Sequence, residues 1–311
     1  NLTNTASMDL PLDLEKSLGN YCRDVDGNEF LDLSSQSGSL SLGYNNPEML
    51  EFSKSPAVSQ HLNTRMALAV FPSQDADHIL RKSFVDLLPR GLDYVFPTMC
   101  DDCSIEVAIK LVTIEFMGRG RADPSVIPQL ELDSCMINSL PGTPEVAILS
   151  FEGSAHGKLF GGISTSSQSD AKFSGLPRLK WPKVQPPEYK YPLAHHTVAN
   201  EVEDERVLAE VLEVINSWEI PVAGVILEPI QGENNGNTFS SFFARGLQEL
   251  LQQKAISLIV DETQSGYYST GKRWAYEHWN LLSAPEFVCS SKKTLSGVVF
   301  TQKRFLAPQA Y

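Results

Sequence analysis

The chain has 311 residues, 42% hydrophobic and 20% charged, a composition typical of a globular protein with one large domain or two ordinary ones. Its formal net charge of −13 argues against nucleic acid and anionic membranes as partners. No apolar run approaches the roughly 18 residues of a transmembrane helix, and no signal peptide is visible at the start. Five scattered cysteines favour a reducing compartment. These features predict a soluble protein of the cytoplasm or the mitochondrial matrix.

The first part of the chain is predicted to form an N-terminal segment over residues 1–48. Within it, residues 19–33 predict two short strands around Asp26 and Gly27, because an Asp-Gly pair between apolar residues favours a hairpin turn. Residues 49–311 are predicted to form a separate, large domain.

In this large domain, strand-like and helical patterns alternate. The predicted strands lie at 92–100, 145–151, 222–230, 256–262 and 286–292. The predicted helices lie at 103–118, 204–218 and 240–254. This alternation predicts an α/β fold with a mostly parallel sheet. Ligands of such sheets bind beyond the carboxyl ends of the strands, so the residues that follow each strand are candidates for chemistry.

Several charged residues stand at these strand ends. Glu228 and Glu233 follow one strand, Asp261 ends the next, and Lys292 and Lys293 follow a third. A lysine can form a Schiff base, and a carboxylate can hold a protonated ring nitrogen. Composition alone leaves a simpler alternative, in which these are solvated loop charges.

Local sequence carries further information. The stretches "LIVDETQSGYYSTGKRWAYEHW", "SSKKTLSG", "VILEPIQGE" and "GNYCRDVDGNEFLDLSSQ" resemble the class III, fold-type I, pyridoxal-phosphate-dependent aminotransferases, and among these the 4-aminobutyrate aminotransferases. The resemblance implies the large domain of that fold, a homodimer, and pyridoxal 5′-phosphate as the cofactor. It also implies transfer of an ω-amino group from a small-molecule donor to 2-oxoglutarate. The family's C-terminal small domain is expected to be largely missing.

The resemblance assigns cofactor roles to four residues. Lys293 matches the Schiff-base lysine, because Gly297 follows it by four residues as in the family, whereas Lys292 lacks this match. Asp261 would pair with the pyridine nitrogen, and Gln264 would bond the phenolic oxygen. His156 matches the histidine of an aromatic-His-Gly-Arg loop.

The chain departs from the family on the cofactor side. Asp101 and Asp102 stand where the family has a small pair before the helix that binds the phosphate. Asp102 is expected to cap that helix. Like charges about 4 Å apart repel by roughly 1 to 4 kcal/mol, so the two carboxylates are expected to weaken phosphate binding. Ala155 replaces an aromatic residue that stacks on the ring, so that contact is expected to be lost.

A further departure concerns the substrate. Lys158 replaces the arginine that grips the substrate carboxylate, and lysine lacks the bidentate fork of arginine. Glu228 and Glu233 match acidic positions near the substrate's amino end. An altered carboxylate grip at Lys158 and Ser37 would fit an alternative, a lysine or ornithine ω-transaminase.

Two further alternatives remain. Cys100 and Cys103 have the spacing of the pair that ligates an iron–sulfur cluster at the dimer interface of animal 4-aminobutyrate aminotransferases, so they could be metal ligands or reduced structural thiols. The flanking aspartates are expected to raise the pKa of both thiols. The aspartate pair and the missing small domain would also fit a non-catalytic, degenerate homologue that acts through dimerisation.

Overall fold

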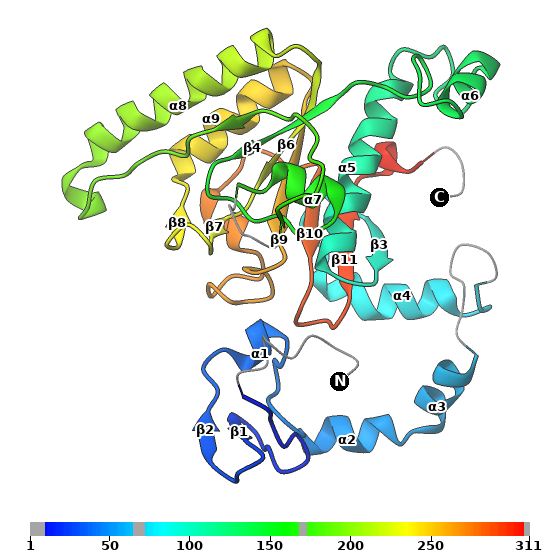
Figure 1. Cartoon of the computed structure of the whole chain (residues 1–311), viewed down its shortest axis with the longest axis vertical. Coiled ribbons are helices and arrows are strands. Elements are labelled where there is room, and N and C mark those ends of the chain that lie inside the picture. Colours follow the sequence, from blue (N-terminus) through cyan, green and yellow to red (C-terminus); the bar gives the residue numbers. More distant parts are fainter. Residues whose placement is uncertain (1–9, 65–71, 168–172, 308–311) are drawn as a thin grey trace. The chain divides into compact units, whose positions relative to one another are not determined.

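The computed structural model describes residues 10–64, 72–167 and 173–307, so the first nine residues of the predicted N-terminal segment lie outside it. The chain divides into two units (Figure 1). The first comprises Asn1–Arg81 together with Lys292–Leu295, and the second comprises Lys82–Ser291 and Ser296–Tyr311.

The first unit contains the predicted hairpin. Strands β1 (Tyr21–Arg23) and β2 (Glu29–Leu31) pair antiparallel, which confirms it. The turn is closed by Asp24, whose carboxylate accepts the backbone N–H of Asn28 at 2.8 Å and its side-chain amide at 2.7 Å. The remaining helices of this part are α1 (Ser35–Gly38), α2 (Pro47–Ser53), α3 (Pro56–Asn63) and α4 (Ala76–Phe84), the last of which contains the boundary between the units.

The second unit is built on a seven-stranded sheet with the order β3-β11-β10-β9-β6-β4-β5. Its strands are β3 (Tyr94–Thr98), β4 (Ala147–Phe151), β5 (Lys183–Val184), β6 (Val222–Leu227), β9 (Ser257–Glu262), β10 (Phe287–Ser290) and β11 (Gly297–Thr301). Among the described strands of this sheet, β11 alone runs against the others, since it pairs antiparallel with both β10 and β3. The mostly parallel α/β sheet is therefore confirmed.

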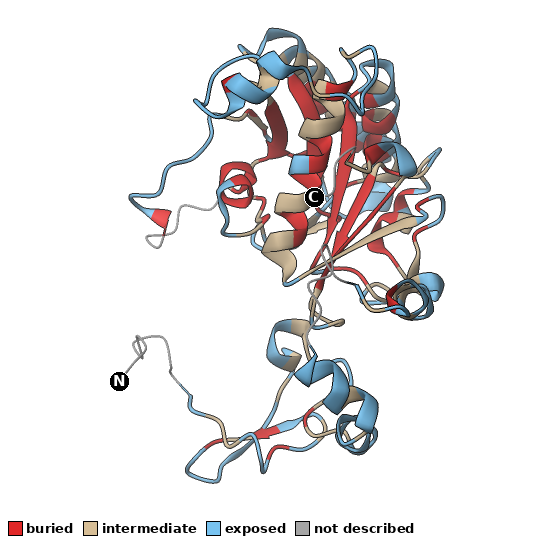
Figure 2. Ribbon diagram, turned by 90° about the vertical axis from the view of Figure 1, so that its right-hand side faces the viewer, coloured by how far each residue is buried: buried red, intermediate tan, exposed pale blue. Residues whose placement is uncertain are grey.

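Helices cover both faces of this sheet. Helix α5 (Asp101–Gly118) packs Ile105, Ala108 and Val112 against one face. Helices α8 (Thr197–Ser217) and α9 (Ser241–Gln253) pack against the other face, with Val207 and Leu247 fully buried. Figure 2 shows the strands buried between these layers. The shorter elements are α6 (Gln129–Cys135), α7 (Phe160–Thr165), β7 (Ile230–Gln231), β8 (Asn237–Thr238) and the 3₁₀ turns Val85–Leu87, Leu193–His195, Ala275–Trp279 and Lys303–Phe305.

Strand β11 is absent from the strands that the sequence predicts, and its first residue has a specific packing role. A Cβ atom on Gly297 would overlap the carbonyl oxygen of Cys100 and the hydroxyl of Thr98. The glycine therefore allows β11 to pass close to the segment that leads from β3 into α5. In the described ranges no helix combines the length and apolar character needed to cross a membrane.

Candidate functional site

Three residues form a buried polar group at the carboxyl ends of β4 and β9. The Nδ1 atom of His156 lies 2.8 Å from Oδ2 of Asp261. The other oxygen, Oδ1, accepts the hydroxyl of Thr263 at 2.7 Å and its backbone N–H at 3.0 Å. His156 is 1% and Asp261 2% exposed, so both oxygens of the carboxylate are held in place away from solvent. The Nε2 atom of His156 is also buried and has no hydrogen-bond partner among the residues that the structure describes, which leaves one polar atom able to meet a ligand.

Glu228, directly after β6, adds a second acid to this group. Its Oε1 accepts the backbone N–H of Ala155 at 3.1 Å, which ties the loop after β4 to the end of β6. Burial raises the pKa of Glu228 to about 7, and the charge of Asp261 acts in the same direction while His156 opposes it. A carboxyl whose pKa is raised toward neutrality by burial is suited to donating or accepting a proton.

Glu262, the neighbour of Asp261 in sequence, has a structural role. Its carboxylate accepts the hydroxyl of Ser265 at 2.6 Å and the backbone N–H of Tyr276 at 2.7 Å. Burial raises its pKa to about 7 as well. Successive side chains of a strand point to opposite faces. Asp261 can therefore belong to the polar group, while the carboxylate of Glu262 links Ser265 to Tyr276 by hydrogen bonds.

Asp101 and Asp102 stand at the start of α5, but the expected cap is wrong. The N-cap residue is Cys100, and Asp102 lies within the first turn. The backbone N–H of Asp102 instead donates to Oδ1 of Asp101 at 3.1 Å. Since Asp102 lies after the N-cap position, its side chain is directed to the loop after β4, where a Cβ atom on Gly157 would come within 2.6 Å of its Oδ1.

The carboxylate of Asp102 is thus part of the same site as His156 and Asp261. Its pKa is raised by burial and by the charge of Asp101, and the charge of Asp261 adds to this effect. The backbone N–H and the positive charge of Lys158 act in the opposite direction. The second unit therefore brings together acids from the ends of β3, β6 and β9 around one histidine.

Other predicted site residues are placed differently. Gln264, Glu233 and Lys158 have exposed positions in the loops after β9, β6 and β4. Lys293 is half-buried in the turn between β10 and β11, and it belongs with Ser37 to the first unit. These two residues are not among those that the second unit brings together, so their roles stay predictions.

The two cysteines at the start of α5 lie together, with 3.4 Å between their sulfur atoms. The hydrogen bond between them is the main cause of the raised pKa of Cys103, followed by burial, and the charge of Asp102 contributes less. Within residues 10–64, 72–167 and 173–307, no group of three or more His, Cys, Asp or Glu side chains could hold a metal ion. An iron–sulfur cluster on this pair would need ligands from a second chain and stays a prediction.

Sequence reasoning identified Asp261 but missed the function of Thr263. The signal was available, because a threonine two residues after a strand-end aspartate can bond back to that carboxylate through both its hydroxyl and its N–H. It also missed Asp102's contact with Gly157, since the two residues lie far apart in sequence and only the fold brings them together.

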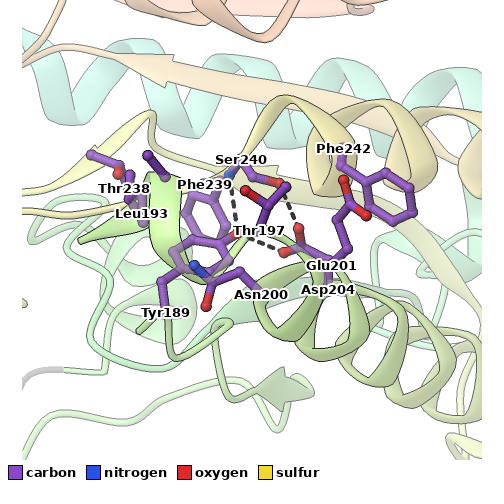
Figure 3. Close-up of a pocket in the computed structure, with 11 residues that line it drawn as sticks. Tyr189, Leu193, Thr197, Asn200, Glu201, Asp204, Thr238, Phe239, Ser240 and Phe242 are labelled. Carbon is purple, nitrogen blue, oxygen red and sulfur yellow. Dashed lines mark hydrogen bonds between the residues drawn. The ribbon is translucent and has the colours of Figure 1, made fainter. Parts of the chain in front are cut away.

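A separate cavity of about 350 Å³ lies between the first turns of α8 and α9 (Figure 3). Its polar centre is Asp204, which accepts the hydroxyls of Tyr189 and Ser240 at 2.6 Å each. Tyr189 in turn accepts the backbone N–H of Ser240 at 3.0 Å. Because these groups satisfy one another, we interpret them as a structural junction that joins the segment before α8 to the starts of α8 and α9, rather than as a set of groups directed at a ligand.

Comparison with known proteins identifies the family. The model of the aminotransferase class-III family matches residues 3–310. The 4-aminobutyrate aminotransferase of Dictyostelium discoideum is 42% identical over 90% of this chain, and the mitochondrial 4-aminobutyrate aminotransferase of Homo sapiens is 36% identical over 94%. The chain spans only 57% and 59% of the lengths of these two relatives.

Solved structures agree on the fold. A lysine aminotransferase from M. tuberculosis aligns with a TM-score of 0.82 at 23% identity, covering 98% of this chain and 66% of that one. At that identity the similarity concerns the fold, which is the α/β fold of the fold-type I aminotransferases. The family match over residues 3–310 and the relatives at 36% and 42% identity show that the chain belongs to the class III aminotransferases.

Proposed function

We propose that this chain is the coenzyme-binding part of a 4-aminobutyrate aminotransferase-like enzyme with weakened or altered activity. The reaction would move an ω-amino group from 4-aminobutyrate, or a related donor, to 2-oxoglutarate. Family membership and relatives of up to 42% identity support this proposal. The single structural observation that carries it is the buried Asp261 carboxylate, held by His156 and Thr263 at the end of β9.

Asp261, His156 and Thr263 form what we call the ring side of the site. This side suits the ring of pyridoxal phosphate, the coenzyme that the family implies. When bound, the coenzyme supplies an electron sink for the carbon that carries the amino group. Asp261 would hold a proton at the ring nitrogen, because a buried carboxylate favours the charged partner next to it. The unpartnered Nε2 of His156 offers a further polar contact in the same buried group. Gln264 would bond the phenolic oxygen, and Lys293 would be the point of covalent attachment.

The start of α5 with Asp101 and Asp102, together with Gly157, forms what we call the phosphate side of the site. It does not suit the phosphate of the coenzyme. A phosphate monoester favours free backbone N–H groups at a helix start. Here the N–H of Asp102 is bonded to Asp101, and the carboxylate of Asp102 lies against Gly157. Ala155 also offers no ring to stack on the coenzyme. These observations support weakened rather than full activity.

Substrate contacts are proposed for four residues. Glu228 and Glu233 would lie near the amino end of the donor, and the pKa of Glu228, about 7, suits a group that shares a proton with an amine. Lys158 and Ser37 would meet the donor's carboxylate. A single ammonium grips a carboxylate less specifically than a guanidinium, so donors other than 4-aminobutyrate, such as lysine or ornithine, fit the same proposal.

Covalent trapping tests the proposal. The purified chain is mixed with pyridoxal phosphate, reduced with borohydride and mapped by peptide mass spectrometry, with Lys293→Ala as the variant and Lys292→Ala as the matched control. We expect a pyridoxyl group on Lys293, retained in Lys292→Ala and lost in Lys293→Ala. Screening of amine donors with 2-oxoglutarate would then identify the substrate. Absence of label on Lys293 at saturating coenzyme would contradict the enzymatic proposal.

The carboxylates at the start of α5 also favour a second candidate. A non-catalytic homologue could keep the fold and act by forming homodimers, or mixed dimers with an active relative. Co-expression with an intact 4-aminobutyrate aminotransferase, followed by purification through a tag on this chain, would test it. Localisation to the mitochondrial matrix or the cytoplasm is part of either proposal, and relatives named as mitochondrial support the former.

A further inference from the structure

Asp102 has a distinctive position in this site. Asp102 lies between the start of α5 and the loop after β4, where its Oδ1 would be 2.6 Å from a Cβ atom on Gly157. The backbone N–H and the positive charge of Lys158 both lower the pKa of this carboxylate, so they act on it favourably. A protein carboxylate therefore already occupies the space beside Gly157 and the positive groups of Lys158, where a bound anion would have to lie.

The helix start offers little compensation. A helix N-terminus carries partial positive charge and attracts phosphate. In α5 the N–H of Asp102 donates to the carboxylate of Asp101 at 3.1 Å, so a side chain of the helix itself uses this donor. Two negative charges in the first turn also offset the positive end of the helix dipole.

Neighbouring negative charges further disfavour a bound phosphate. The charges of Asp101 and Asp261 both raise the pKa of Asp102. The charges of Asp261 and Glu233 likewise raise the pKa of Glu228. The positive charge of Lys158, whose position is exposed, acts on Asp102 in the opposite direction. A dianionic phosphate ester would add negative charge to a site that is already rich in carboxylates.

We propose that this site prefers the free alcohol form of a pyridoxal-type ring over its phosphate ester, with Asp102 as the residue that discriminates. The hydroxymethyl group of the unphosphorylated ring is neutral and can donate its O–H to the Asp102 carboxylate, a charge-assisted hydrogen bond. The ester can donate nothing there when fully ionised, and it meets repulsion. This inference rests on the proposed function, because it requires that the ring itself binds beside Asp261.

Two ligands without an aldehyde isolate this effect from covalent attachment. Pyridoxine and pyridoxine 5′-phosphate carry the same ring and differ at the phosphate, and neither can form an imine with Lys293 or any other lysine. Equilibrium dialysis of the full chain measures the dissociation constant of each ligand. The decisive quantity is the ratio of the two constants, since it cancels the contribution of the ring.

The variant Asp102→Asn removes the charge but keeps the shape and a side-chain oxygen beside Gly157. We expect the native chain to bind pyridoxine more tightly than its phosphate. In Asp102→Asn the ester should bind about a hundredfold more tightly than in the native chain, as expected for the loss of a unit charge a few ångströms from a dianion. Asp133→Asn, at an exposed position on α6 of the same unit, is the matched control and should leave the ratio unchanged.

The outcomes separate this inference from the proposed function. Tighter binding of the ester by the native chain, or an unchanged ratio in Asp102→Asn, would overturn the inference while the ring site still stands. Failure of the native chain and of Asp102→Asn to bind either ligand would overturn the ring site itself, and the inference with it. A preference for pyridoxine that weakens at high ionic strength would support the electrostatic cause.

Discussion

Replacing Glu228 by glutamine should stabilise the protein at neutral and alkaline pH. Glu228 is 4% exposed, and burial raises its pKa from 4.5 to about 7. Its carboxylate accepts a hydrogen bond from the backbone N–H of Ala155. Glutamine keeps a carbonyl oxygen for this bond and has nearly the same shape, so the substitution removes the buried charge with little change in packing.

The size of the stabilisation follows from the pKa shift of Glu228. Below pH 4.5 the carboxyl is protonated in both the folded and the unfolded state, and it carries no penalty. Between pH 4.5 and 7 the folded state binds more protons than the unfolded state, so the free energy of unfolding falls as the pH rises. Above pH 7 the loss is complete, at about 3 kcal/mol for this group. Glu228→Gln should therefore gain up to about 3 kcal/mol at pH 8 and almost nothing at pH 4.5.

Urea denaturation at a series of pH values measures this difference. All four tryptophans of the chain lie in the second unit, so their fluorescence reports on the unit that contains Glu228. Glu249→Gln, at an exposed position on α9, is the control and should shift the free energy of unfolding by less than about 0.5 kcal/mol at every pH. A Glu228→Gln gain that is the same at pH 5 and pH 8 would refute the argument from burial.

Two further substitutions test the packing around the site and the cavity. Gly297→Ala would place a methyl group on the carbonyl oxygen of Cys100, and we expect a loss of about 3 kcal/mol in the free energy of unfolding, measured by urea denaturation. Ser240→Ala removes the hydroxyl that accepts the Phe243 N–H at the start of α9 and donates to Asp204, and it should cost about 2 kcal/mol, measured as a lower Tm.

The longer helices and most of the longer strands of the second unit could be predicted because each carries its own local pattern. β9 reads as a continuous apolar run that ends in acids, and α9 has apolar residues on one face, so their types follow from local sequence. β11 could not be predicted in the same way. Its five residues follow a glycine and a short turn, and its antiparallel place between β10 and β3 depends on pairings distant in sequence.

The site shows the same division. Asp261 could be predicted from its place at a strand end, but its partner His156 lies 105 residues away, and sequence spacing cannot bring the two together. The direction of the Asp102 side chain was equally inaccessible, because it depends on whether α5 begins at Cys100 or Asp101. A shift of one residue at a helix start changes which side chain caps the helix and which one faces the neighbouring loop.

The two sides of the site are under different physical constraints. Asp261, His156 and Thr263 bond one another in the interior, so changing one of them leaves a buried polar partner unsatisfied and destabilises the fold. Asp101 and Asp102 are only half-buried, and the fold can accept other residues at these positions. Retention of the ring side is therefore expected even in a chain that no longer catalyses a reaction, because stability alone maintains it. The phosphate side is maintained by the ligand, so ligand binding at Asp102 is the more sensitive measure of what this protein does.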